Sequence, residues 1–127
     1  MSGCKIDSEA SPQFKKLRER WKKSGYLSVD ADLEEAFSNI RKNIQANHCS
    51  RVPRFGEVLK GYHLLKYRQK DRASREGASG GWRILALYDP TTDTLYPIIV
   101  FPKKAMENAD EDTINDAVTE LLQDVLL

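Results

Sequence analysis

The fold of this chain is decided by a stretch that reads WRILALYDPTTDTLYPIIVF, residues 82–101. Its two ends are rich in β-branched, aromatic and other apolar residues, whereas the segment between them, residues 89–94, is polar and contains Pro90. This pattern predicts two β-strands, over residues 82–88 and 95–101, joined by a turn. So short a connection leaves no room for a helical crossover, and the strands are therefore expected to pair antiparallel.

A run of similar composition, residues 62–68, precedes this stretch and is separated from it by a longer polar segment, residues 69–81. We expect it to be a third strand of the same antiparallel sheet. Pro97 lies inside the last run and has no amide hydrogen to donate. Either that part of the strand lies at an edge of the sheet, or the strand begins after Pro97.

Two amphipathic helices are predicted before the sheet and one after it. Ser11 and Pro12 open the first, over residues 12–24, and Gly25 can close it. The second begins near Asp30 and the last near Asp112. Their apolar stripes are expected in the core: Phe14, Leu17, Trp21, Leu33, Phe37, Ile40, Ile44, Ile114, Val118, Leu121, Leu122 and Val125. The fold class is therefore α+β, with two N-terminal helices packed on a small antiparallel sheet and a C-terminal helix.

Length and composition indicate a single domain over residues 1–127, of which 40% are hydrophobic. Residues 1–10 are expected to be either a flexible N-terminus or a short edge strand. No run approaches the roughly 20 apolar residues that span a bilayer, so no membrane partner is expected. Cys4 and Cys49 are the only cysteines, too few for a disulfide framework or a structural zinc site. A reducing cytoplasm and no metal are the corresponding expectations.

Charge is segregated along the chain although the net charge is only +1. Residues 51–83 hold nine Lys or Arg against three acids, whereas residues 105–127 hold seven acids and no base. The basic segment predicts contact with a polyanion, and the acidic segment is expected to lie away from any such surface.

Several of these cations fall inside the predicted strands. Because side chains alternate between the faces of a sheet, Lys66 and Arg68 share one face, and Arg83 can join them from the next strand. Lys103 and Lys104 follow the third strand and extend the same cluster. Gly80-Gly81, just before Trp82-Arg83, permits close approach of a ligand to the backbone. The simpler alternative is a solvated, charged sheet face without a ligand.

These residues also carry a family resemblance. Three segments in this order resemble the C-terminal half of the RelE/ParE toxin superfamily, especially its RelE and HigB branches. They are Lys66-Tyr67-Arg68, Ser79-Gly80-Gly81-Trp82-Arg83, and an apolar strand followed by Lys103-Lys104. The family pattern is K-x-R, then S-G-G-x-R, then a strand that ends in a lysine. The resemblance covers residues 60–104 well and the rest of the chain loosely.

The resemblance implies the toxin of a type II toxin–antitoxin pair, which cleaves mRNA on the ribosome without a metal or other cofactor. Its partners would be a cognate antitoxin, the ribosome and mRNA. By position in the motifs, Arg83 would stabilise the scissile phosphate, Lys66 would act as a base that its cationic neighbours keep neutral, and Lys104 would complete the catalytic set. The expected phosphate-binding residues are Arg68, Lys103, Arg54 and Lys60.

The chain departs from the family pattern after the third strand. Family members often place a Tyr or His there, whereas this sequence has Ala105, Met106, Glu107 and Asn108. Two alternatives therefore stay open: a RelE-fold protein-binding module without catalysis, and a gyrase inhibitor of the ParE type. His48 and His63 are the only histidines, and His63 is expected on the strand face opposite Lys66.

Overall fold

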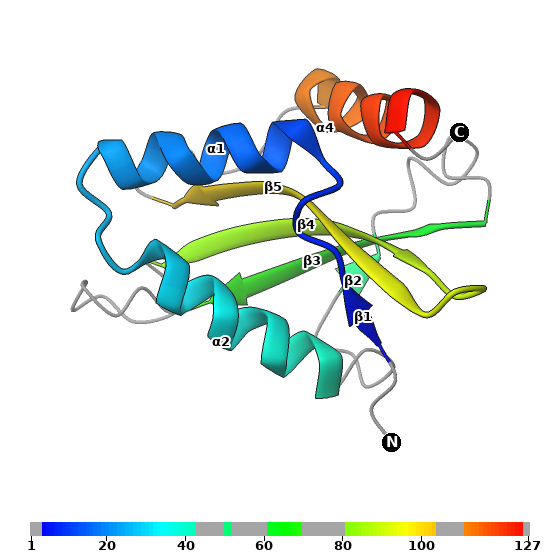
Figure 1. The fold of residues 1–127 in the computed structure, drawn as a ribbon, viewed down its shortest axis with the longest axis horizontal. Coiled ribbons are helices and arrows are strands. Elements are labelled where there is room, and N and C mark those ends of the chain that lie inside the picture. Colours follow the sequence, from blue (N-terminus) through cyan, green and yellow to red (C-terminus); the bar gives the residue numbers. More distant parts are fainter. Residues whose placement is uncertain (1–3, 43–49, 52–60, 70–80, 104–110, 126–127) are drawn as a thin grey trace.

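The computed structural model describes residues 4–42, 50–51, 61–69, 81–103 and 111–125 (Figure 1). In these ranges the chain forms β1 (Lys5–Ile6), α1 (Pro12–Lys23), α2 (Val29–Lys42), β2 (Ser50–Arg51), β3 (His63–Gln69), β4 (Trp82–Asp89), β5 (Thr94–Pro102) and α4 (Glu111–Thr119), which continues as the π-helix η3 (Glu120–Val125). The predicted α+β fold is confirmed, with two N-terminal helices, a central sheet and a C-terminal helix that contacts it.

The five strands form one sheet in the order β1-β5-β4-β3-β2. The strands predicted from the sequence, β3, β4 and β5, are its antiparallel centre, as their short connections require. The sheet is nevertheless mixed, because β1 pairs parallel with β5 through Lys5↔Thr94 and Ile6↔Leu95. Two alternatives were predicted for residues 1–10, a flexible N-terminus or a short edge strand. Lys5–Ile6 forms the short edge strand.

Pro97 lies within β5, at an irregularity of the sheet. The register passes from Leu85↔Ile99 to Ala86↔Pro97, so Ile98 is an extra residue opposite β4. The short β1 pairs only with Thr94 and Leu95 and does not extend along β5 as far as Pro97. A proline that cannot donate to a ladder is tolerated at such a bulge next to an open edge, which is why the strand continues through it.

Helix α1 has the boundaries that its local signals predict. The Ser11 hydroxyl oxygen accepts a hydrogen bond from the Phe14 amide at 3.2 Å, and Pro12 occupies the first turn. Gly25 follows the helix with φ of 98°, a left-handed conformation that glycine adopts without strain. Phe14 and Trp21 are buried, and the Trp21 indole N–H donates to the Val100 carbonyl at 2.7 Å, which joins the helix to β5.

The hydrophobic core lies where the helices meet the sheet. Figure 1 shows α1 along β5 and α2 along β3, and both pairs are in contact. Phe14 and Phe37 pack with ring centroids 6.2 Å apart, and Tyr26 packs edge-on against Trp82 at 5.3 Å. From α4 and η3, Ile114, Val118 and Leu121 are buried in the same cluster, as their spacing predicts. Among the described helices, none is long and apolar enough to cross a membrane.

Candidate phosphate-binding face of the sheet

Three of the cations predicted for the site share one face of the sheet. In the β3–β4 ladder Arg68 lies directly opposite Arg83, and Lys66 lies opposite Leu85. Residues directly opposite each other in an antiparallel pair point to the same side, and every second residue along a strand does so too. The pairing therefore places Lys66, Arg68 and Arg83 together; we call them the sheet cation cluster.

A backbone contact brings Lys103 to the same end of the sheet. The Lys103 amide donates to the Gly81 carbonyl at 2.9 Å, just beyond the last β4–β5 pair, Trp82↔Pro102. Gly81 precedes Arg83 by two residues, so the Lys103 backbone adjoins the end of the sheet that carries Arg68 and Arg83. The side chain of Lys103 is half-buried. This end of the sheet therefore carries four of the predicted cations.

The four side chains differ in exposure, and Arg83 is the buried member. Only 5% of Arg83 is exposed, whereas Lys66 is half-buried and Arg68 is exposed. One Arg83 Nη1–H donates to the Trp82 carbonyl at 3.4 Å. Burial lowers the pKa of the Arg83 guanidinium, and the positive charge of Arg68 lowers it further. Arg83 is thus a buried cation that lies opposite a second, exposed cation.

The opposite face of the same strand end is bound to helix α2. The Trp82 indole N–H donates to Asp32 Oδ2 at 2.9 Å, and the Ser28 hydroxyl donates to the same oxygen at 2.8 Å. Gln69, which lies opposite Trp82 in the ladder, donates from Nε2 to Glu35 Oε2. Since Trp82 and Gln69 directly adjoin Arg83 and Arg68 in the sequence, α2 holds the backbone that carries both arginines.

We call the Asp32–Trp82 and Glu35–Gln69 pairs the α2 latch. Sequence reasoning missed it, because Asp32 is also a typical acidic residue for the first turns of a helix. In the structure Asp32 is instead completely buried. One feature of the sequence could have indicated these hydrogen bonds: Asp32 and Glu35 are two acids on the helix face that also carries the apolar stripe.

Other predicted residues fall elsewhere. Several of them lie outside the described residues: Lys104, Arg54, Lys60, His48 and residues 105–108, the positions at which the resembled family often has a Tyr or His. His63 lies opposite Tyr88, on the face away from Lys66, as predicted. Within the described part of the chain, no group of three or more His, Cys, Asp or Glu side chains could hold a metal ion.

Comparison with known proteins gives no further guide to this site. No family model matches the chain, and no curated protein and no solved structure is significantly similar to it.

Proposed function

We propose that this protein cleaves ribosome-bound mRNA, as the toxin of a toxin–antitoxin pair, and uses the sheet cation cluster to bind the scissile phosphate. The observation that carries the proposal is the direct cross-strand pairing of Arg68 with Arg83. Like charges directly opposite each other destabilise a sheet, so an anion between them would stabilise this arrangement. Guanidinium groups suit a phosphate because they can donate two parallel hydrogen bonds.

The chemistry proposed is transfer within the RNA backbone. The ribose 2′-oxygen forms a bond to the adjacent phosphorus while the bond from phosphorus to the 5′-oxygen breaks. The 2′-hydroxyl proton passes to a base, for which Lys66 is the candidate, and the leaving 5′-oxygen takes up a proton from water. The products are a 2′,3′-cyclic phosphate and a 5′-hydroxyl. Arg83 would stabilise the additional charge on the phosphate oxygens in the transition state.

One observation favours a second candidate, the protein-binding module without catalysis. Arg83 is only 5% exposed, so direct contact with an RNA phosphate requires a ligand that reaches into the sheet surface. In the binding module the same arginine would meet an acidic side chain of a partner protein. The two candidates differ in whether RNA is broken.

Induced expression without an antitoxin separates them. We expect wild-type protein to arrest growth and to create new mRNA ends within translated regions. Lys66→Ala should abolish both effects, whereas Lys42→Ala, at the exposed end of α2, should leave them intact. Normal growth and unchanged mRNA ends with abundant folded wild-type protein would refute the nuclease proposal and leave the binding module.

A further inference from the structure

A second concentration of positive charge lies on α1, outside the sheet cation cluster. The helix carries six Lys or Arg and one acid, Glu19. Two of the cations are bound to α2, because Arg18 Nε lies 2.7 Å and Lys22 Nζ 2.9 Å from the Asp30 carboxylate. The other four are exposed and line a shallow, open depression together with Glu19 and Ser24: Lys15, Lys16, Arg20 and Lys23. We call these four residues the α1 basic face.

Helix stability accounts for only part of this charge pattern. Cations in the last turn interact favourably with the helix dipole, which explains Lys23 and Arg20. Glu19 is four residues from both Lys15 and Lys23, a spacing that favours opposite charges. Lys16 and Arg20 are also four residues apart, and like charges at this spacing destabilise a helix. With four exposed cations against one acid, the face is strongly positive and suits an external anion.

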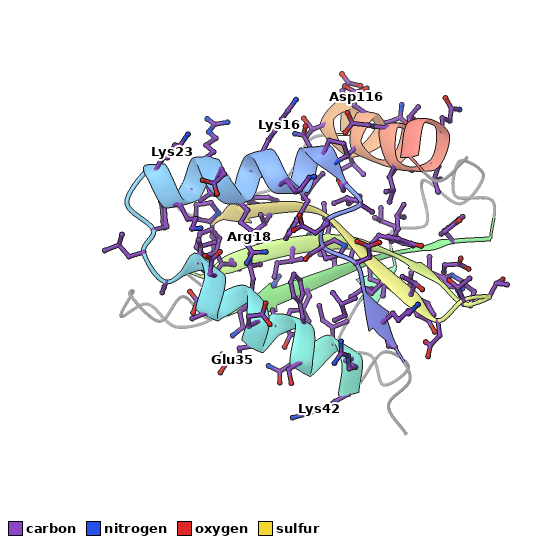
Figure 2. All side chains as sticks on the ribbon, in the orientation of Figure 1. Lys16, Arg18, Lys23, Glu35, Lys42 and Asp116 are labelled. Carbon is purple, nitrogen blue, oxygen red and sulfur yellow. The ribbon has the colours of Figure 1, made fainter. Side chains whose placement is uncertain are left out.

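The α1 basic face and the sheet cation cluster lie on different sides of the molecule. Trp82 and Arg83 are consecutive in β4, so their side chains point to opposite faces of the sheet. Trp82 contacts α2 and the turn that follows α1, through Asp32 and Tyr26. Figure 2 shows Lys16 and Lys23 pointing outward from α1, away from the sheet. One anion therefore cannot occupy both surfaces at close range.

We propose that the α1 basic face binds the sugar–phosphate backbone of RNA without reading its sequence. The residues Lys16, Arg20 and Lys23 follow one line along the helix and span about 10 Å at 1.5 Å per residue. A DNA duplex presents one phosphate charge per roughly 1.7 Å of its axis and an RNA duplex a similar density, so this line faces several phosphates. The choice of RNA over DNA rests on the proposed function, to which the α1 basic face adds a binding surface, but binding itself does not require RNA cleavage.

The composition of the face favours RNA over a protein or a membrane. Protein interfaces depend on buried aromatic and aliphatic anchors, and no large apolar side chain lines this depression. The only strongly exposed large apolar residue in the described ranges is Leu27, which lies in the turn beyond the helix. Membrane-surface helices insert an apolar face, but the apolar face of α1, with Phe14 and Trp21, is buried in the core. Nucleic-acid interfaces, by contrast, are polar and strongly positive.

Binding of a 2′-O-methyl RNA duplex tests the proposal, because the duplex cannot be cleaved through its 2′-oxygen. We expect Lys16→Gln/Arg20→Gln to weaken binding at least tenfold at low salt. The slope of log affinity against log salt should also fall by roughly two, one for each lost phosphate contact. The matched control is Arg41→Gln/Lys42→Gln, which removes the same charges from the exposed end of α2 and should change neither quantity.

Several outcomes would overturn the proposal. The first is that Lys16→Gln/Arg20→Gln binds the duplex as tightly as the wild type. The second is that Arg41→Gln/Lys42→Gln loses as much affinity as the α1 variant. The third is that the protein binds anionic phospholipid vesicles through α1 but does not bind the duplex. Lys15→Gln/Lys23→Gln repeats the test at the remaining two positions, and circular dichroism confirms that each variant is folded. The test measures binding to the duplex and not mRNA cleavage in cells. If the nuclease proposal failed, the binding result would therefore still stand.

Discussion

At the scale of single residues, the Asp32–Trp82 pair of the α2 latch depends on the Asp32 carboxylate. Asp32 is completely buried, yet its Oδ2 accepts from both the Trp82 indole and the Ser28 hydroxyl. A buried acceptor of this kind is retained because the donors that it satisfies would otherwise lie in a region without water. Trp82 is itself fully buried and directly precedes Arg83, so Asp32 acts on the sheet cation cluster by holding its backbone.

Replacing this carboxylate tests the latch. Asp32→Ala removes the acceptor of the buried Trp82 indole N–H and of the half-buried Ser28 hydroxyl. A buried donor left unsatisfied costs about 1–3 kcal/mol, and we expect a loss of that size in the free energy of unfolding, measured by urea titration of Trp fluorescence. Asp32→Asn keeps an acceptor oxygen and should lose less. Exposed Asp112→Ala is the control, and an unchanged urea midpoint in Asp32→Ala would show that the Asp32–Trp82 pair does not stabilise the fold.

At the scale of elements, the β4–β5 hairpin is held by its turn. Asp93 has φ of 54°, a left-handed conformation that aspartate tolerates better than most residues. The Asp89 carboxylate accepts from the Thr91 amide at 2.9 Å, which closes the other side of the turn. The Tyr88 hydroxyl donates to the Asp93 carboxylate. This hydrogen bond, together with burial, raises the pKa of Tyr88 to about 12.

The raised pKa predicts how alkali affects the protein. Tyrosine in an unfolded chain has a pKa of about 10, so the folded state favours protonated Tyr88. The raised pKa of Tyr88 therefore adds to the free energy of unfolding. This contribution is complete below pH 10 and is lost as the pH rises through about 12. We expect Tyr88→Phe to remove that part of the alkaline loss, measured as the change in urea midpoint between about pH 9 and pH 12. If the two proteins lost stability in parallel, the phenol would not be coupled to folding.

Element boundaries were predictable wherever a local signal sets them. Ser11, Pro12 and Gly25 place α1 to within one residue, because capping and left-handed glycine act on adjacent backbone groups. The strand β1 has only two residues and no periodicity, so its parallel pairing with β5 depends on contacts distant in sequence. The bulge at Ile98 is similar: Pro97 indicated an irregularity, but its form depends on the pairing with β4.

At the scale of the whole molecule, alternation along one strand was enough to place Lys66 and Arg68 on one face, whereas the position of Arg83 depended on the register, which puts it on the same face. Burial was not predictable, because it depends on how helices and loops cover the sheet, and Arg83 is in fact almost completely buried. The α1 basic face was also missed: block counts of charge directed attention to residues 51–83, although α1 alone carries six cations. The catalytic roles of Lys66, Arg83 and Lys104 stay predictions.

The most direct test of the central claim is in vitro cleavage of mRNA on purified ribosomes by wild-type protein and by Arg83→Met. Methionine keeps an unbranched apolar chain at this buried position and removes the charge together with the hydrogen bond to the Trp82 carbonyl. We predict products with a 2′,3′-cyclic phosphate from the wild type, and a rate at least about a hundredfold lower for the variant. Circular dichroism and urea titration of Arg83→Met should show a folded protein, so that a lower cleavage rate reports the lost guanidinium and not unfolding. Undiminished cleavage by stably folded Arg83→Met, or no cleavage by the wild type, would contradict the account.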